Sequence, residues 1–273
     1  MKKIMVAGGD RRMLLLAERL RKDGHEVHTL GLSAGDEEEQ VTAPDLLLLP
    51  YPFSVKNGKI PTLTGLTLLP QEVLRLAGGN TIVFAGAGVE KDEMQFSGCI
   101  LRYTDADDFA AQNAALSAEA AVFETMLHSD LALADTKLLV MGYGAFGRLL
   151  ALKLKALETE VWVAVRREQQ RAQAESEGMN AVLLGQLGQV IPDMQMIINT
   201  IPAWVLDESL LQKVPEGCWL LETASAPYGF DLQAAGRMGK RCALLPGLPA
   251  RYAPASAALV LYRAVQQLTG RCS

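Results

Sequence analysis

Short, uninterrupted runs of hydrophobic residues alternate along the chain with longer stretches in which hydrophobic residues recur every three or four positions. Uninterrupted runs are typical of strands buried on both faces of a parallel sheet, and the longer period is typical of helices. The runs that predict strands are 3–7, 26–30, 44–50, 81–85, 100–103, 137–141, 160–165, 181–184, 196–199, 218–222 and 243–245. The alternation predicts an α/β fold with open parallel sheets.

The length of the chain, 273 residues, is enough for two domains with separate cores. We expect two Rossmann-like domains, the first over residues 1–105 as a substrate domain and the second over residues 106–252. An alanine-rich helix from Asp105 to Leu133 is expected to connect them, and a helix over 253–268 to return to the first. Open α/β sheets bind ligands beyond the carboxyl ends of their strands, so we expect the active site in an interdomain cleft.

A glycine-rich turn follows the run at 137–141 and has the spacing of a dinucleotide-binding loop. Gly142 permits a sharp turn, Gly144 lets a pyrophosphate approach the backbone, and Gly147 lets the next helix pack on the sheet. The N-terminus of that helix favours an anion because its first N–H groups are unpaired. The spacing alone is a weak signal, but the run at 160–165 arrives about 20 residues later, where a second Rossmann strand should end.

Arg166 and Arg167 follow that second strand, at the position that distinguishes the two nicotinamide dinucleotides. An acidic residue there bonds the ribose hydroxyl of NAD, whereas arginine suits the 2′-phosphate of NADP. We therefore expect the domain at 106–252 to bind NADP, with NAD as the alternative. A structural turn followed by a solvated basic pair is the competing interpretation. The residues expected to contact the cofactor are Gly142, Tyr143, Gly144, Ala145, Phe146, Gly147, Arg166, Arg167, Thr200, Ile201, Pro202, Gly247 and Pro249.

Composition excludes several other classes of protein. Hydrophobic residues make up 49% and charged residues 21% of the chain, which is typical of globular proteins, and a net charge of −5 argues against nucleic acid as a partner. No apolar run reaches the roughly 18 to 20 residues of a membrane span, and the first residues lack a signal-peptide core, so we expect a cytoplasmic protein. The four cysteines form no CxxC pair and the three histidines do not cluster, so no metal site is expected.

Four side chains are candidates for catalysis or substrate binding. Arg12, at the start of the first helix, is a candidate for binding an anionic substrate, and the alternative is a surface arginine. Glu119 lies in the connecting helix and is a candidate for accepting a proton; an exposed helix glutamate is the alternative. Asn199 and Ser225 follow strand ends, where bonds to cofactor or substrate compete with turn and cap roles.

The order and spacing of several motifs resemble those of the A subunit of bacterial dipicolinate synthase over nearly the whole chain. The motifs are Gly8-Gly9-Asp10 with Arg12, the GYGAFG loop at 142–147, Ile198–Pro202, PGLP at 246–249, which we expect to form a loop after a strand end, and Ala253-Pro254. The resemblance implies an NAD(P)-dependent oxidoreductase that converts dihydrodipicolinate, a small dicarboxylate, to dipicolinate during sporulation. It also implies that the partner is the flavoprotein-like B subunit of dipicolinate synthase, in the mother cell of a sporulating bacterium, and we expect a homo-oligomer. The PGLP segment continues with Ala250-Arg251-Tyr252, which leaves the role of Arg251 open.

Two other kinds of function compete with this one. A dehydrogenase of the 2-hydroxyacid type needs a histidine late in the chain, yet none follows His128, and the catalytic Lys–Asp pair of the shikimate type is not found in the first domain. A module that senses or binds NADP without turnover is the third interpretation, because no acid/base residue stands out. Activity with dihydrodipicolinate and NADP distinguishes all three.

Overall fold

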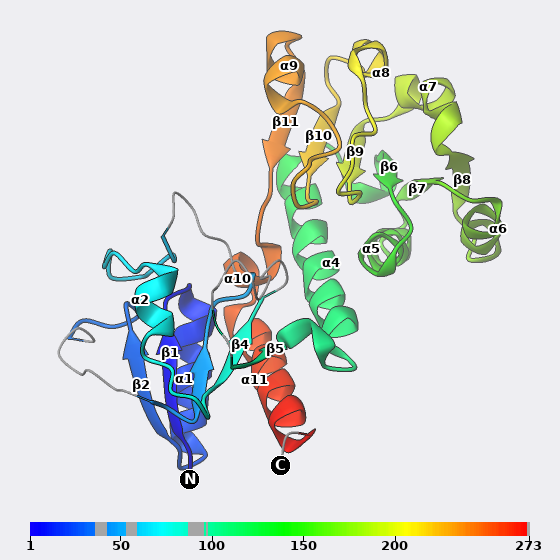
Figure 1. Cartoon of the computed structure of the whole chain (residues 1–273). Coiled ribbons are helices and arrows are strands. Elements are labelled where there is room, and N and C mark those ends of the chain that lie inside the picture. Colours follow the sequence, from blue (N-terminus) through cyan, green and yellow to red (C-terminus); the bar gives the residue numbers. More distant parts are fainter. Residues whose placement is uncertain (36–42, 53–58, 87–95, 97, 272–273) are drawn as a thin grey trace. The chain divides into compact units, whose positions relative to one another are not determined.

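The computed structural model describes residues 1–35, 43–52, 59–86, 96 and 98–271 (Figure 1). The chain divides into two compact units, one made of residues 1–113 and 250–273, the other of residues 114–249. Each unit contains one parallel sheet with helices against it, so the predicted α/β class with two Rossmann-like domains is confirmed.

The N-terminal unit is built on a five-stranded parallel sheet in the order β2-β1-β3-β4-β5. Its strands coincide with uninterrupted hydrophobic runs, because a parallel strand that is covered on both faces needs apolar side chains on both sides. Its strands are β1 (Lys3–Ala7), β2 (Glu26–Leu30), β3 (Leu46–Leu48), β4 (Ile82–Ala85) and β5 (Cys99–Arg102). The helices of this unit are α1 (Arg11–Lys22), α2 (Pro70–Leu74) and α11 (Pro254–Arg271), with a 3-10 turn η1 (Tyr103–Asp105) after β5.

Helix α1 begins where Asp10 caps it, because the Asp10 side chain accepts a hydrogen bond from the Arg12 backbone N–H. Leu16 and Leu20 lie on its buried face, one turn apart. Helix α11 packs against α1, and the Arg19 guanidinium lies 4.7 Å from the centre of the Tyr262 ring. The last helix of the chain is therefore part of the core of the N-terminal unit.

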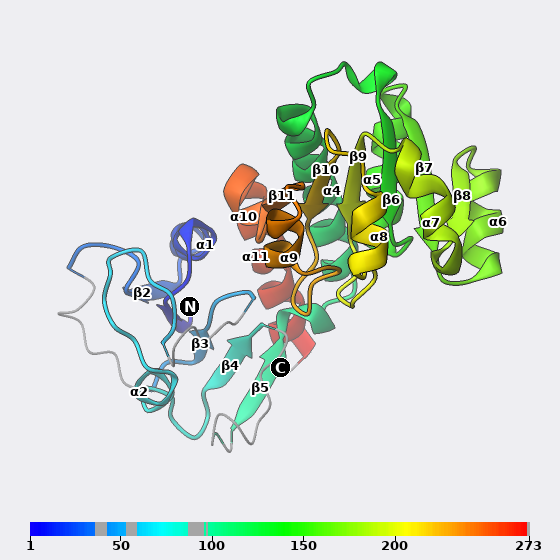
Figure 2. The ribbon, with the colours of Figure 1, turned by 90° about the horizontal axis from the view of Figure 1, so that it is seen from above.

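The C-terminal unit has a six-stranded parallel sheet in the order β11-β10-β9-β6-β7-β8, and Figure 2 shows β9 between β10 and β6. The strand order reverses between β6 and β9, which makes the carboxyl ends of these two strands the switch point of the sheet. The strands are β6 (Lys137–Met141), β7 (Glu160–Val165), β8 (Asn180–Leu183), β9 (Met196–Asn199), β10 (Trp219–Glu222) and β11 (Arg241–Leu244).

Helices cover both faces of the second sheet. Leu139 and Met141 of β6 face a core that also contains Leu187 and Leu211 from short helices, while α5 packs against β6 and β7. The helices of this unit are α5 (Ala145–Ala156), α6 (Glu168–Ser176), α7 (Leu187–Val190), α8 (Glu208–Lys213) and α9 (Leu232–Arg237), with 3-10 turns η2 (Leu133–Asp135), η3 (Leu184–Gln186) and η4 (Ile191–Asp193). Within the described ranges, no helix is both long enough and apolar enough to cross a bilayer.

Two elements cross the boundary between the units and differ from prediction. Helix α4 (Phe109–His128) is shorter than the helix predicted over 105–133, because η1 precedes it and η2 follows. The segment predicted as a loop at 246–249 is a loop only in its first half, since Leu248 begins helix α10 (Leu248–Tyr252). That correction places Pro249 in the first turn of a helix, a position that proline tolerates because its missing N–H has no partner there.

A half-buried glutamate joins the glycine-rich turn to the end of α6. Glu177, which caps α6, accepts a hydrogen bond from the Tyr143 hydroxyl at 2.5 Å and lies 2.7 Å from Arg148 Nη2 in α5. Hydrogen bonds from Arg148 and Tyr143 lower the pKa of Glu177 to about 2. The turn after β6 is thus tied to a helix that follows the next strand.

We predict that this contact makes part of the stability depend on pH. A carboxyl group whose pKa is lowered by folding stabilises the protein when ionised; this contribution is present above its ordinary pKa near 4.5 and is lost as the pH falls toward 2. Glu177→Gln should therefore lower the Tm at about pH 6, and the Tm difference from wild type should shrink by about pH 3. Thermal unfolding measured across this range tests the prediction.

Glu175→Gln is the matched control, because Glu175 is an exposed neighbour in the same helix whose ion pair with Arg171 is longer, at 3.7 Å. It should change the Tm little at either pH. A Tm difference for Glu177→Gln that stays constant across the range would contradict the prediction.

Candidate functional site

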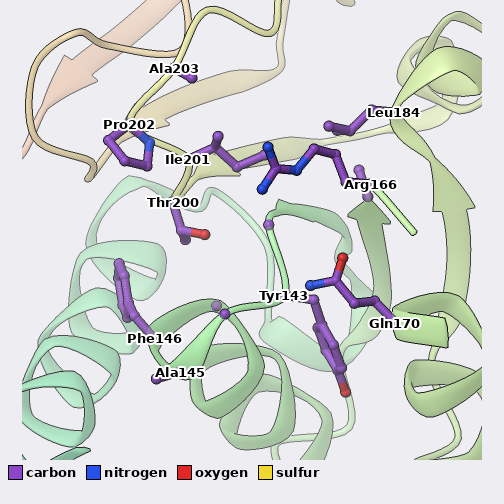
Figure 3. Close-up of a pocket in the computed structure, with 14 residues that line it drawn as sticks. Tyr143, Ala145, Phe146, Arg166, Gln170, Leu184, Thr200, Ile201, Pro202 and Ala203 are labelled. Atoms are coloured by element: carbon purple, nitrogen blue, oxygen red, sulfur yellow. The ribbon is translucent and has the colours of Figure 1, made fainter. Parts of the chain in front are cut away.

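A pocket of about 440 Å³ lies at the switch point of the C-terminal sheet, beyond the ends of β6, β7 and β9 (Figure 3). This is where open α/β sheets bind their ligands. Its wall is formed by Gly142, Tyr143, Gly144, Ala145, Phe146, Gly147, Ala164, Arg166, Gln170, Leu184, Thr200, Ile201, Pro202 and Ala203. Most of the residues expected to contact a cofactor are therefore brought together in one pocket.

The floor of the pocket depends on glycine at two positions. Gly142 has a φ of +102°, which a residue with a side chain rarely adopts. A Cβ at Gly147 would lie 2.3 Å from the Gly142 carbonyl oxygen and 2.9 Å from the Thr200 hydroxyl. The Thr200 hydroxyl donates to the Met141 carbonyl at 2.7 Å, so the first turn of α5 rests directly on the ends of β6 and β9.

The N-terminus of α5 opens into this pocket without a side-chain cap. Gly144 is the N-cap residue, and no side chain bonds the first N–H groups of the helix. A Cβ built on Gly144 would meet nothing within 4 Å, so the glycine faces open space. Unpaired N–H groups around such a space suit the oxygens of a phosphate.

Arg166 supplies a cation to the pocket from the end of β7. Figure 3 shows its side chain extending across the pocket toward Thr200 and Ile201, with Gln170 from α6 on the same wall. Arg167 does not line the pocket: it is the N-cap residue of α6, where its carbonyl accepts hydrogen bonds from the backbone of the first turn. The two adjacent arginines therefore differ in position, although their place in the sequence makes them look alike.

The wall holds little acid/base chemistry. Among the described lining residues, only Tyr143 and Arg166 carry titratable side chains. Burial, together with the bond to Glu177, raises the pKa of the Tyr143 hydroxyl above its ordinary value. A tyrosine hydroxyl whose pKa is raised is a poor general base, and a guanidinium has no acceptor atom, so the wall itself offers no general base.

Asn199, expected at the site, lies beneath the pocket rather than in its wall. It is fully buried, and its amide nitrogen donates to the Ile201 carbonyl and to both carboxylate oxygens of Glu222, each at 2.9 Å. Its amide oxygen accepts from the Ile201 backbone N–H at 3.1 Å. Every polar group of this side chain therefore faces the protein.

Glu222 is a buried acid that sequence reasoning missed. It ends β10 directly opposite Asn199 in the register of the sheet and has no exposed surface. Burial raises the pKa of this carboxyl, and hydrogen bonds from Asn199 and from the backbone of Gly229 and Ala224 oppose the rise. The signal in the sequence was an acid at the carboxyl end of a strand that neighbours β9, the same reasoning that selected Asn199.

The other candidates of the C-terminal unit lie apart from the pocket wall. Ser225 is exposed in the loop after β10, and Glu119 is exposed on α4. Gly247, with a φ of +65°, and the buried Pro249 also lie outside the lining. Gln170, by contrast, lines the pocket from the first turn of α6 and was missed by sequence reasoning.

Arg12 belongs to the N-terminal unit, at the carboxyl end of β1. Its side chain is 7% exposed, and its guanidinium forms a two-point contact with Asp10, with the closest approach at 2.7 Å from Nη2. Nη2 also donates to the Tyr51 carbonyl at 2.5 Å. These contacts fix the orientation of the guanidinium and place a carboxylate beside its charge. Among the described residues, no group of three His, Cys, Asp or Glu side chains could hold a metal ion.

Comparisons with known proteins match both halves of the chain. Residues 3–95 match the family model described as the N-terminal domain of the dipicolinate synthase A subunit. Residues 132–220 match the model described as acetohydroxy acid isomeroreductase, NADPH-binding domain. The second match covers the glycine-rich turn, Arg166 and the loop after β9.

Individual proteins match over nearly the full length. The dipicolinate synthase A subunit of Bacillus subtilis (strain 168) is 25% identical over 97% of this chain and 95% of its own. The crystal structure of its counterpart from Bacillus halodurans has a TM-score of 0.84 at 24% identity, over 97% and 96%. The fold is shared more distantly with a transhydrogenase from Sinorhizobium meliloti, with a TM-score of 0.68 at 15% identity over 97% and 93%. The resemblance to the dipicolinate synthase A subunit that the motifs indicated is therefore confirmed.

Proposed function

We propose that this protein is a nicotinamide-dependent oxidoreductase that oxidises dihydrodipicolinate to dipicolinate with NADP. The observation that carries the proposal is the pocket at the switch point, where the uncapped N-terminus of α5 and the Arg166 cation share one wall. The similarity of nearly the whole chain to the dipicolinate synthase A subunit supports the choice of substrate. The match to an NADPH-binding domain supports the choice of cofactor.

The pocket residues fit a dinucleotide with two anionic groups. The N–H groups at the start of α5 would hold the pyrophosphate, with Gly144 leaving room for it. Arg166 and Gln170 would hold the 2′-phosphate of NADP from the end of β7 and the first turn of α6. When bound, the nicotinamide ring supplies the chemistry by accepting a hydride.

The reaction makes modest demands on the protein. Oxidation of the dihydropyridine ring of the substrate would remove one hydride and one proton, and the ring would become aromatic. This gain favours the step, so positioning the ring matters more than a strong base. A pocket wall without a general base fits such a reaction better than one in which a hydroxyl group must be deprotonated.

The two carboxylates of the substrate need cations, and we propose that Arg12 provides one. Asp10 and the Tyr51 carbonyl hold its guanidinium in one orientation, which reduces the entropy lost when a carboxylate binds. We also propose that the B subunit of dipicolinate synthase is a partner, because the relative is named as one component of a synthase with more than one kind of chain.

Steady-state oxidation of dihydrodipicolinate with NADP, measured with and without the B subunit, tests the proposed function. We expect reduction of NADP to depend on the substrate. Tight NADP binding without turnover under both conditions would instead favour a module that senses NADP.

We predict that Arg166 determines the preference for NADP. Charge-assisted bonds to the 2′-phosphate contribute about 1.5 to 3 kcal/mol, so Arg166→Ala should weaken NADP binding roughly tenfold to a hundredfold and leave NAD binding nearly unchanged. Arg167→Ala should have the smaller effect, because Arg167 lies outside the pocket wall. Calorimetric titration of both cofactors against the three proteins measures this. Equal affinities of the wild type for NADP and NAD would contradict it.

We predict that Arg12→Ala weakens dicarboxylate binding by about 1.5 to 3 kcal/mol, seen as a higher KM, while the Kd for NADP changes little. Arg11→Ala is the matched control, since Arg11 is the exposed neighbour in the same turn of α1. It should leave both constants unchanged. A parallel loss of substrate and NADP binding in Arg12→Ala would indicate misfolding, and unchanged kinetics would exclude Arg12 and direct attention to Arg251.

A further inference from the structure

We propose that Asn199 and Glu222 are a buried pair of positioning residues that fixes the loop 200–202, which lines the nucleotide pocket, by tying it to the neighbouring loop 223–229. The inference rests on the proposed function, in that the pocket is taken to bind NADP. Asn199 then positions a loop instead of contacting the ligand directly, as its place at a strand end had suggested. Glu222 positions the neighbouring loop and orients the Asn199 amide.

Asn199 shapes the first of these loops from below. Its amide oxygen accepts from the Ile201 N–H and its amide nitrogen donates to the Ile201 carbonyl, so both backbone groups of Ile201 are bonded to one side chain. Ile201 lines the pocket, as do its neighbours Thr200 and Pro202. A change in the orientation of the Asn199 amide would therefore move a wall of the pocket.

Glu222 shapes the second loop in the same way. One carboxylate oxygen accepts from the Ala224 N–H at 2.9 Å, and the other accepts from the Gly229 N–H at 2.8 Å. The bonded amides stand on either side of Ser225 along the chain. The carboxylate therefore closes the loop into a fixed turn that presents Ser225 to solvent.

The two loops are joined because the two side chains bond each other. The Asn199 amide nitrogen lies 2.9 Å from each Glu222 oxygen, and Gly229 packs so closely on this amide that a Cβ there would lie 2.4 Å from its nitrogen. Thr223 adds a backbone bond to the Asn199 carbonyl at 3.1 Å. Neither loop can shift without breaking a contact that the other uses.

Direct contact with a ligand is excluded by burial, since both residues have 0% exposure. In these contacts the Glu222 carboxylate accepts hydrogen bonds from three groups, the Asn199 amide and the Ala224 and Gly229 backbone N–H groups, and none of them is a cation. The ionised form of Glu222 is therefore stabilised only while these three donors stay aligned with it. In Glu222→Gln an NH₂ group replaces one of the two acceptor oxygens, and this NH₂ group then faces the backbone N–H of Ala224 or of Gly229. The substitution keeps the size of the side chain but leaves a buried donor unpaired.

The test compares Glu222→Gln with Glu124→Gln by amide hydrogen exchange and by NADP titration. Glu124 is the matched control, because it is 1% exposed in the same unit and pairs with His128 away from the pocket wall. Glu222→Gln should speed exchange of the Ile201 amide, which bonds Asn199 and not Glu222, and should weaken NADP binding roughly tenfold. Glu124→Gln should do neither.

Each outcome decides the proposal. Unchanged Ile201 exchange and unchanged NADP affinity in a folded Glu222→Gln protein would overturn it, as would equal losses in Glu124→Gln, which would reveal general destabilisation. If Glu222→Gln does not fold, Glu222→Asp, which keeps the carboxylate one methylene shorter, should still speed Ile201 exchange. If the wild type binds neither NADP nor NAD, the proposed function fails, while exchange at Ile201 still decides whether the pair joins the loops.

Discussion

The close approach of α5 to the ends of β6 and β9 is the constraint on which the pocket depends. Gly147 lies against the Gly142 carbonyl and the Thr200 hydroxyl at distances that exclude any side chain, and Thr200 in turn bonds the end of β6. This packing directs the N–H groups of α5 at the switch point of the sheet. The floor of the pocket is therefore set by this packing. Its wall is completed by Arg166 and Ile201, and the buried Asn199–Glu222 pair lies behind Ile201.

The sequence predicted the fold well where the signal is local. The bounds of β1, β2, β7 and β9 agree with prediction because an uninterrupted hydrophobic run depends only on residues that are neighbours in the sequence. Short helices such as α8 and α9 contain too few turns to show a period, and their visible signals are the capping aspartates Asp207 and Asp231.

The residues of the site were likewise predictable only where the signal is local. The glycine-rich turn is contiguous, so its place in the pocket could be predicted from spacing alone. Glu222 could not be paired with Asn199, because their contact depends on the register of two strands separated by 23 positions in the chain. Arg12 shows the same limit. Its charge indicated that it could bind an anionic substrate, but the sequence did not predict that its guanidinium bonds the Asp10 carboxylate and the Tyr51 carbonyl.

The N-terminal unit includes the last helix of the chain, and this has a consequence for synthesis. Helix α11 packs against α1 and has a buried face that includes Leu261, Val265 and Leu268, so segments far apart in the sequence share one core. A ribosome therefore completes the whole of the C-terminal unit before the first unit receives its final helix. Until that moment the apolar side of α1 that α11 covers is without its partner, and a prematurely terminated chain would expose it to chaperones and proteases.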